Sequence, residues 1–426
     1  IKMEGFNDNA IDYGTIDGAV TTPMQIFGGF NNDGRFFPLD NEKNITDFET
    51  SMPHGEKGFS ITIKSGFYSA ICAGGRQTAG SKSKLNGVMG TPNQPIKCTI
   101  TMDIDREWND TYNATKKLKS DYDAGIILAG NHEGAMFADV DIIVRSGKVA
   151  RIVNGTLGAQ TELELTYNNT TYKVPCNTYM GRANITLDPA SSEYNKDTNI
   201  NNRVVVTELY GGSMGRGHDD NVKINNPFYG YSTITINGGT FKILPEDNAK
   251  KSNILCGIFG AGAGGMNGIG TDTHHTPDAS IAYWNDAKNK DVMLYGPYKD
   301  AKNNLVHYNC YNENNTYTDV DPLKTNTQII IKDGVFGSDT EPIDGIYAGG
   351  SGYMSPGLWR TKSGTPSTTG GNVYGSKEGT AVSLTINGGE FYCENGIFAG
   401  GRGTKHYYSE KLYGGNASDY TALGQT

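Results

Sequence analysis

The chain has 426 residues, carries a formal net charge of −9 and contains 57 glycines. This acidic composition, without a dense basic cluster, argues against a nucleic-acid partner. No run of 18 apolar residues is present, so we expect no transmembrane segment. The glycines follow no three-residue period, which excludes a collagen-like chain.

The first 58 residues are irregular, but they hold two faint copies of a pattern that becomes clear further on. Thr15–Gly18 and Ile26–Gly29 each bring an aliphatic residue close to a glycine. We interpret residues 1–58 as a degenerate first repeat and an N-terminal cap, because the open end of a β-structure has to be covered.

From residue 59 a short strand recurs along the chain. The clearest copies alternate hydroxyl-bearing and aliphatic residues and then end in a polar residue and glycine, as in Ser60–Gly66. Thr99–Asp103 and Asn184–Asp188 lack the glycine, and the copies at Ile142 and Ile329 have isoleucine in place of the threonine. Successive strand residues face opposite ways, so the aliphatic residues of each copy share one face. The positions that we expect to align are Ile61, Ile100, Ile142, Ile185, Ile234, Ile329 and Leu384, with Thr62, Thr101, Thr186, Thr235 and Thr385 on the other face.

A second strand follows each copy and ends in small residues, most clearly in Gly257–Gly262, Gly345–Gly350 and Gly396–Gly401. We call each two-strand repeat a rung. Glycine supplies the backbone angles of a sharp corner, and a unit this short can bury its apolar face only by stacking on others. The uneven spacing indicates constant rungs that carry insertions. We predict an all-β, single-stranded parallel β-helix, right-handed as crossover connections usually are.

The repeats have the form INGGxF followed by GIFAGG, and with them the chain resembles bacterial surface proteins of the pectin-lyase-like, right-handed parallel β-helix type. The resemblance spans most of residues 59–403. It implies a solenoid that carries loops. Lyases, hydrolases and adhesins all occur in that superfamily, so the resemblance implies a fold and not one activity.

The repeats divide the chain into three parts, of which residues 1–58 are the first. The β-helix covers 59–403, with its largest insertion at about 266–326 and another at 351–381. Residues 404–426 form a C-terminal tail or cap. A smaller insertion is a predicted β-hairpin with the strands Leu163–Tyr167 and Thr171–Val174.

The cysteines show no CxxC spacing, so the sequence gives no support for a zinc site. They are either small buried thiols in the rungs or partners in disulfides. The six are Cys72, Cys98, Cys176, Cys256, Cys310 and Cys393.

One acidic run is a candidate calcium site. Asp103, Asp105 and Glu107 would share a face if their strand continued through them. Calcium prefers several carboxylate oxygens, although a solvated acidic edge explains the same residues more simply. We expect no cofactor other than calcium.

The long insertions leave each rung just after its glycine-rich end, so stacking should gather them along one edge. Loops on a rigid scaffold commonly carry binding sites. Arginines after such exits could recognise carboxylates or sulfates, and exposed tryptophans could stack on sugar rings. Packing on neighbouring loops or in the core is the alternative for each. The ligand-binding candidates are Arg76, Arg216, Arg402, Trp108, Trp284 and Trp359.

The densest polar cluster is a weak catalytic candidate made of Arg216, His218, Asp219 and Asp220. Paired carboxylates beside a histidine can act as acid and base in hydrolysis. Pectin-lyase-like hydrolases use such groups on separate rungs with their own flanking motifs, and those motifs are missing here. Adjacent Asp219 and Asp220 would also point in different directions.

We therefore expect an extracytoplasmic, adhesin-like surface protein that binds a glycan or a protein partner through loops stacked along one edge. It would lie outside the cell or at the cell surface, associated with an outer membrane; a lipoprotein anchor is not visible in the sequence. An enzyme is the less favoured interpretation, and it would be a polysaccharide lyase or glycosidase. A structural component of a surface assembly is the third.

Overall fold

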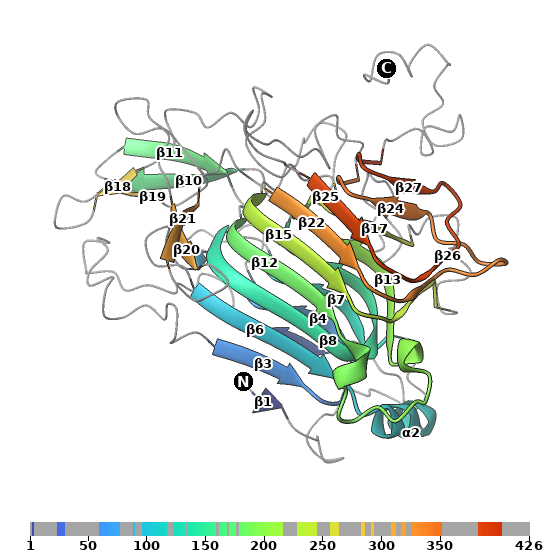
Figure 1. The fold of residues 1–426 in the computed structure, drawn as a ribbon. Helices are drawn as coiled ribbons and strands as arrows, with labels where there is room; N and C mark the ends of the chain where they lie inside the picture. Colours follow the sequence, from blue (N-terminus) through green and yellow to red (C-terminus); the bar gives the residue numbers. More distant parts are fainter. Residues whose placement is uncertain are drawn as a thin grey trace, which may run out of the picture.

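One sheet of parallel strands, curled into a half-barrel, dominates the computed structural model of the chain (Figure 1). Few helices accompany it, so the fold agrees with an all-β parallel solenoid. The structure describes residues 2–3, 24–29, 59–76, 88–89, 96–116, 122–132, 135–158, 162–167, 170–175, 179–215, 228–244, 256–263, 283–285, 291–293, 308–311, 317–320, 326–351 and 382–402.

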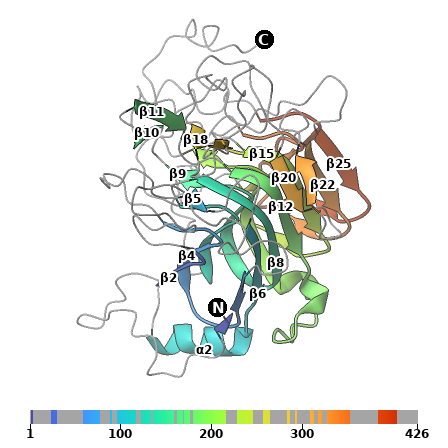
Figure 2. The ribbon, with the colours of Figure 1, turned by 90° about the vertical axis from the view of Figure 1, so that its left-hand side faces the viewer.

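The first half of the sheet stacks the first strand of each rung in chain order, and every pairing is parallel. Strand β8 then runs on into the second half, so it joins the two halves (Figure 2). The strands are β1 (Lys2–Met3), β3 (Phe59–Ile63), β6 (Ile96–Asp103), β8 (Ala135–Val153), β12 (Tyr179–Leu187), β15 (Phe228–Ile236), β22 (Asn326–Ile331) and β25 (Val382–Ile386), with β5 (Val88–Met89) beside the start of β8.

The second half stacks the second strands in the same order, again in parallel. In the last three rungs this strand is split in two. The strands are β2 (Met24–Phe27), β4 (Tyr68–Cys72), β7 (Ala124–Leu128), the end of β8, β13 (Val204–Tyr210), β16 (Thr240–Phe241) with β17 (Gly257–Phe259), β23 (Val335–Phe336) with β24 (Gly345–Tyr347), and β26 (Glu390–Phe391) with β27 (Ile397–Phe398).

The predicted aliphatic column is confirmed. Each of its members is the register partner of the next, from Ile61 to Leu384, and all but Leu384 are buried. The threonines also align, with Ile143 and Ile330 standing in the same column between them. The first half of the sheet therefore turns one apolar face to the core and one polar face outward.

The second half of the sheet is apolar on both faces. On one face Ile71, Ile258 and Ile346 join the main core. On the other face Tyr210, Phe259 and similar side chains form a second buried cluster with residues that follow the strands, such as Met214. Aromatic rings of successive rungs stack there, with centroids 4.8 Å apart for Tyr210 and Phe259.

The two corners of a rung need glycine for different reasons. At the corner between the strands, Gly239 has φ +112°, a left-handed conformation that side chains rarely adopt. At the corner after the second strand, a Cβ on Gly260 would lie 2.0 Å from the carbonyl oxygen of Ala348 in the next rung. The glycine-rich ends of the repeats therefore allow neighbouring backbones to approach closely.

After the second strand the chain forms a third, very short ladder, which we call the bridge column. Parallel pairing joins β9 (Leu157–Gly158) to β14 (Met214–Gly215). Isolated parallel bridges extend it toward both ends of the stack. These bridges are Arg76 with His132, His132 with Leu157, Ala263 with Ser351, and Ser351 with Arg402.

The insertions leave the rungs at more than one place. Helix α2 (Arg106–Lys116) and the 3-10 turns η2 (Pro189–Ser191) and η3 (Ile200–Asn202) lie between the two strands of their rungs. The predicted hairpin is confirmed as β10 (Glu162–Tyr167) with β11 (Thr170–Pro175). Two antiparallel pairs lie in the predicted 266–326 insertion: β18 (Tyr283–Asn285) with β19 (Asp291–Met293), and β20 (Tyr308–Tyr311) with β21 (Tyr317–Val320).

Among the described residues, no helix is long and apolar enough to cross a membrane. The predicted first repeat is present in part, because β2 pairs with β4. Thr15–Gly18, most of the 351–381 insertion and the 404–426 tail lie outside the described residues.

Candidate functional site

Two insertions meet at the corner between the two halves of the sheet. Helix α2 follows β6, and residues 188–203 follow β12, at the same end of these strands (Figure 1). The Asp103 carboxylate on β6 accepts hydrogen bonds from Ser192 Oγ at 2.5 Å and from the Glu193 amide at 3.0 Å. We call α2 and residues 188–203 together the insertion edge.

Asp105 starts the helix. Its amide donates to the Lys64 carbonyl at 2.7 Å, and its Oδ1 accepts from the Trp108 amide at 3.1 Å, which satisfies a free donor of the first turn. Glu107 is exposed in the same turn, where the helix dipole favours an acidic side chain.

The three residues of the candidate calcium site are therefore not brought together. The strand ends at Asp103 and a helix begins at Arg106, so the strand spacing that would align Asp103, Asp105 and Glu107 does not apply. The first two carboxylates instead accept hydrogen bonds from protein groups. Among the described residues, no group of three His, Cys, Asp or Glu could hold a metal ion.

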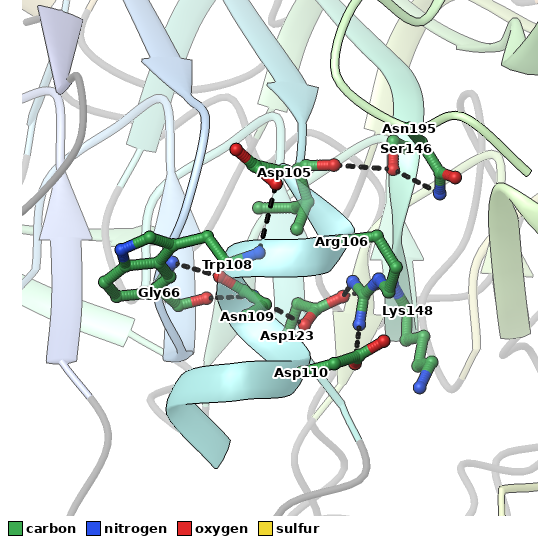
Figure 3. A network of polar contacts seen from close by, with 11 residues as sticks. Gly66, Asp105, Arg106, Trp108, Asn109, Asp110, Asp123, Ser146, Lys148 and Asn195 are labelled. Carbon is green, nitrogen blue, oxygen red and sulfur yellow. Dashed lines mark hydrogen bonds and ion pairs between the residues drawn. The ribbon is translucent and has the colours of Figure 1, made fainter. Parts of the chain in front are cut away.

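Asn109 locks α2 onto the stack (Figure 3). Its side chain is fully buried and binds both backbone groups of Gly66: the Gly66 amide donates to Oδ1 at 2.8 Å, and Nδ2 donates to the Gly66 carbonyl at 3.0 Å. Nδ2 also donates to Asp123 Oδ1 at 2.8 Å. The other Asp123 oxygen accepts from the Lys148 amide at 2.7 Å. The helix is thus tied to three successive rungs.

Arg106 completes this network through an ion pair with Asp123 and a second one, at 3.2 Å, with Asp110 (Figure 3). Burial disfavours the charged guanidinium, but the carboxylates of Asp123 and Asp110 outweigh that effect and raise the pKa of Arg106. The residue stays charged, so its role is to hold the helix.

The outer surface of the insertion edge carries aromatic side chains. Trp108 is half-buried and its ring stacks on Tyr112, with centroids 4.8 Å apart and planes 11° from parallel. Tyr112 in turn lies 6.4 Å from Phe67. Lys64 Nζ lies 4.7 Å from the ring centroid of Tyr194, which comes from the second insertion. A rigid, partly exposed aromatic pair of this kind can contact the apolar face of a sugar.

The predicted arginine row is not a continuous surface. Arg76 and Arg402 lie in the same bridge column but at its opposite ends. Arg76 donates to Gln25 Oε1 at 3.1 Å. Arg402 is 7% exposed and binds both carboxylate oxygens of Asp344, with Nε and Nη2 at 2.6 and 2.8 Å, so it is an internal ion-pair partner.

Several candidates lie outside the described residues: Arg216, His218, Asp219, Asp220 and Trp359. Trp284 belongs to β18, but its side chain is also outside them. Of the ligand-binding candidates, Trp108 and Arg76 keep partly exposed side chains.

The described cysteines follow the simpler interpretation of small thiols in the rungs. Cys72, Cys98 and Cys256 are buried and free, and Cys393 is free and half-buried. Burial raises the pKa of each of the buried thiols, so they are poor nucleophiles. Cys176 and Cys310 have side chains outside the described residues.

Sequence reasoning missed a fully buried ion pair in the second half of the sheet. Arg151 on β8 and Glu208 on β13 are register partners, both 0% exposed, with Nε and Oε2 2.5 Å apart. Within the described structure, neither Nη atom of Arg151 has a hydrogen-bond partner. Two opposite charges at one position of otherwise apolar strands were the signal that could have revealed the pair.

The chain was compared with protein-family models, with curated proteins and with solved structures, and none of them matches it. The geometry of the insertion edge and of the stack is therefore the basis for any functional assignment.

Proposed function

We propose that this protein is an extracytoplasmic, adhesin-like surface protein that binds a glycan through the insertion edge. The observation that supports this most directly is the half-buried Trp108–Tyr112 ring pair on a helix that Asn109 ties to three rungs. Such a platform loses little conformational freedom when it binds a ligand.

The chemistry of the helix fits a neutral or cationic sugar better than an anionic one. Glu107, Asp110 and Thr111 are exposed on the same helix as the ring pair. Carboxylates and a hydroxyl beside an aromatic ring can accept and donate hydrogen bonds to sugar hydroxyls while the ring contacts the C–H face. The net charge of −9 favours the same class of ligand.

The test begins with a glycan array on the purified chain, followed by calorimetric titration of the strongest ligand. Trp108→Ala should weaken binding up to about tenfold, because an aromatic contact contributes about 0.5–1.5 kcal/mol beyond the area that it buries. Thr340→Ala, a change of an exposed residue in a rung far from the insertion edge, is the control and should bind within about twofold of the natural chain.

Asn109→Ala separates a positioned ring pair from a merely exposed one. It keeps both rings but removes the contacts with Gly66 and Asp123, so it should weaken glycan binding while leaving the far rungs folded. If Trp108→Ala binds as tightly as the natural chain, the insertion edge is not the site. Release of reducing ends or unsaturated sugars by the natural chain would instead identify an enzyme.

We also propose that the solenoid is a right-handed parallel β-helix of the pectin-lyase-like type. The parallel order of the rungs in both halves of the sheet supports this, since nearly all parallel crossovers are right-handed. An experimental structure with left-handed crossovers would refute it.

A further inference from the structure

Four asparagines in the described part of the chain are followed directly by glycine. Such a pair is prone to lose the asparagine side-chain nitrogen as ammonia, because a residue without a side chain lets its amide nitrogen approach the asparagine Cγ. The fold places the four pairs in different surroundings. They are Asn154–Gly155, Asn237–Gly238, Asn387–Gly388 and Asn395–Gly396.

Hydrogen bonds hold two of these asparagines in place. Asn154 is fully buried, and its Nδ2 donates to the Ala183 carbonyl at 2.8 Å and to Ser232 Oγ at 3.1 Å. Asn395 Nδ2 donates to Asp344 Oδ1 at 3.0 Å. A side chain fixed in this way does not turn its Cγ toward the amide nitrogen of the next residue.

The other two pairs share the sequence Ile-Asn-Gly-Gly and lie at the same corner of two different rungs. Residues 188–203 cover the first of them. Asn237 is half-buried, and its Nδ2 donates to Asp188 Oδ1 at 3.4 Å. A Cβ on Gly238 would lie 2.9 Å from Pro189 Cγ, so the insertion packs directly on this pair.

Asn387 has no such cover. Its side chain is exposed, and neither that side chain nor the Gly388 amide makes a hydrogen bond among the residues that the structure describes. A Cβ on Gly388 would meet only the backbone of Lys332, in the rung before it. Lys332 is itself exposed at this corner although a further rung follows it, so the corner column faces solvent and not the next rung.

We propose that Asn387 is a site of spontaneous hydrolytic modification, which converts it to aspartate or isoaspartate. The Gly388 nitrogen gives its proton to water and attacks Asn387 Cγ. The bond from Cγ to the side-chain nitrogen breaks, and ammonia leaves. Water then opens the cyclic succinimide, at the side-chain carbonyl to give aspartate or at the backbone carbonyl to give isoaspartate. One water is consumed for each ammonia released, and nothing is oxidised or reduced.

Isoaspartate lengthens the corner, because the backbone then runs through the side-chain carbon. On the two sides of this corner, the Asn387 amide donates to the Ile331 carbonyl and the Glu390 amide donates to the Gly334 carbonyl, both at 2.8 Å. A longer corner moves one of these bonds out of register. We therefore expect β26 to loosen from β23 in the modified chain, while β25 stays paired with β22.

The test is incubation of the full natural chain at neutral pH in heavy-oxygen water, followed by peptide mapping with mass spectrometry. Oxygen from the solvent marks each asparagine that is hydrolysed during the incubation. We expect Asn387 to be converted about tenfold or more faster than Asn237, because Asn237 reacts only when residues 188–203 open locally. The denatured chain should lose this difference, since both asparagines lie between isoleucine and two glycines.

Asn387→Gln is the control variant, because its longer side chain forms the cyclic intermediate poorly and its exposed position loses no contact. Hydrogen exchange at the Glu390 amide should become faster in the incubated natural chain and stay unchanged in this variant.

Equal conversion of Asn387 and Asn237 in the folded chain, or a difference between them that persists in denaturant, would overturn the site. Unchanged exchange at the Glu390 amide after conversion would overturn the loosening of β26. None of these outcomes involves a glycan, so this proposal and the proposed function can fail separately.

Discussion

The two halves of the curled sheet are made of the same rungs but solve different packing problems. The first half buries one face and leaves a polar one outside, where Thr186 and Thr235 are partners in neighbouring strands. The second half is covered on both sides, and every residue of β13 is buried. The comparison shows that one repeat can hold an alternating strand and a nearly continuous buried strand next to each other.

A strand buried on both faces cannot place its polar groups in water, so those groups must find partners inside. In the second half, Arg151 is paired with Glu208, and Asp344 is bound by Arg402 and by the Tyr347 hydroxyl. Burial and the Asp344 carboxylate raise the pKa of Tyr347, which keeps that hydroxyl a donor. In the first half, the hydroxyl column needs no such arrangement because solvent reaches it.

The largest loss of stability should come from breaking the buried ion pair of Arg151 and Glu208. Glu208→Gln leaves the Arg151 guanidinium buried without a countercharge, which should lower the free energy of unfolding by about 3–5 kcal/mol. Chemical unfolding followed by circular dichroism measures this change. Asp110→Asn removes a carboxylate that is 57% exposed from the ion pair with Arg106 and is the control, with an expected loss of about 0.5 kcal/mol or less.

The double variant Arg151→Met/Glu208→Leu sharpens the same comparison. Apolar replacement of both partners removes the buried charges together, so it should recover most of the stability that Glu208→Gln loses. If the double variant is as unstable as the single one, the stability of the second half depends on the shapes and the hydrogen bond of Arg151 and Glu208 and not only on their charges.

A smaller difference in the free energy of unfolding should separate alanine substitutions on the two faces of one strand in the first half. Ile234→Ala opens a cavity in the main core and should cost about 2–5 kcal/mol. Thr235→Ala, one residue further on the outer face, should cost about 0.5 kcal/mol or less. Equal losses in an unfolding experiment would mean that the outer face of the first half is also packed against something.

The smallest expected effect is the pH dependence of stability and labelling at the cysteine thiols. Burial, and after it the Asp344 carboxylate, raises the pKa of Cys393 to about 11. The stability carried by its protonated form is fully present below the ordinary value of 9.0 and is lost as pH rises through about 11. Peptide mapping after iodoacetamide labelling should show Cys393 reacting faster as pH approaches 11, with Cys72 and Cys98 protected until the chain unfolds. Labelling of Cys98 as fast as Cys393 in the folded chain would contradict the buried core.

The sequence was sufficient to predict the stack. Alternation in Ser60–Ile63 and its copies identified the inward column, and the register confirms it residue by residue from Ile61 to Leu384. The two-sided burial of the second half was not predicted. Runs such as Ala124–Leu128 carry apolar residues at adjacent positions, and strand periodicity alone cannot say what covers the outer face.

The site was harder to predict than the fold. The candidate calcium site of Asp103 to Glu107 assumed that the strand continues. Asp105 instead caps a helix, and the hydrogen bond from the Trp108 amide to its side chain favours the helix over the strand. Arg402 was a predicted ligand-binding residue because it directly follows the glycine-rich end of a rung, where the chain leaves the stack. Its partner is instead Asp344, which is 58 positions away in the sequence. Contacts between different rungs of this kind cannot be read from spacing within one repeat.

The ladder of rungs also determines how the molecule yields to force. Each rung is held mainly by its immediate neighbours, so tension applied at the last described rung would detach rungs one after another in small steps. The tie that Asn109 and Asp123 make across three rungs interrupts that sequence. The rungs that follow β8 should therefore detach at lower force than the three rungs that Asn109 and Asp123 connect.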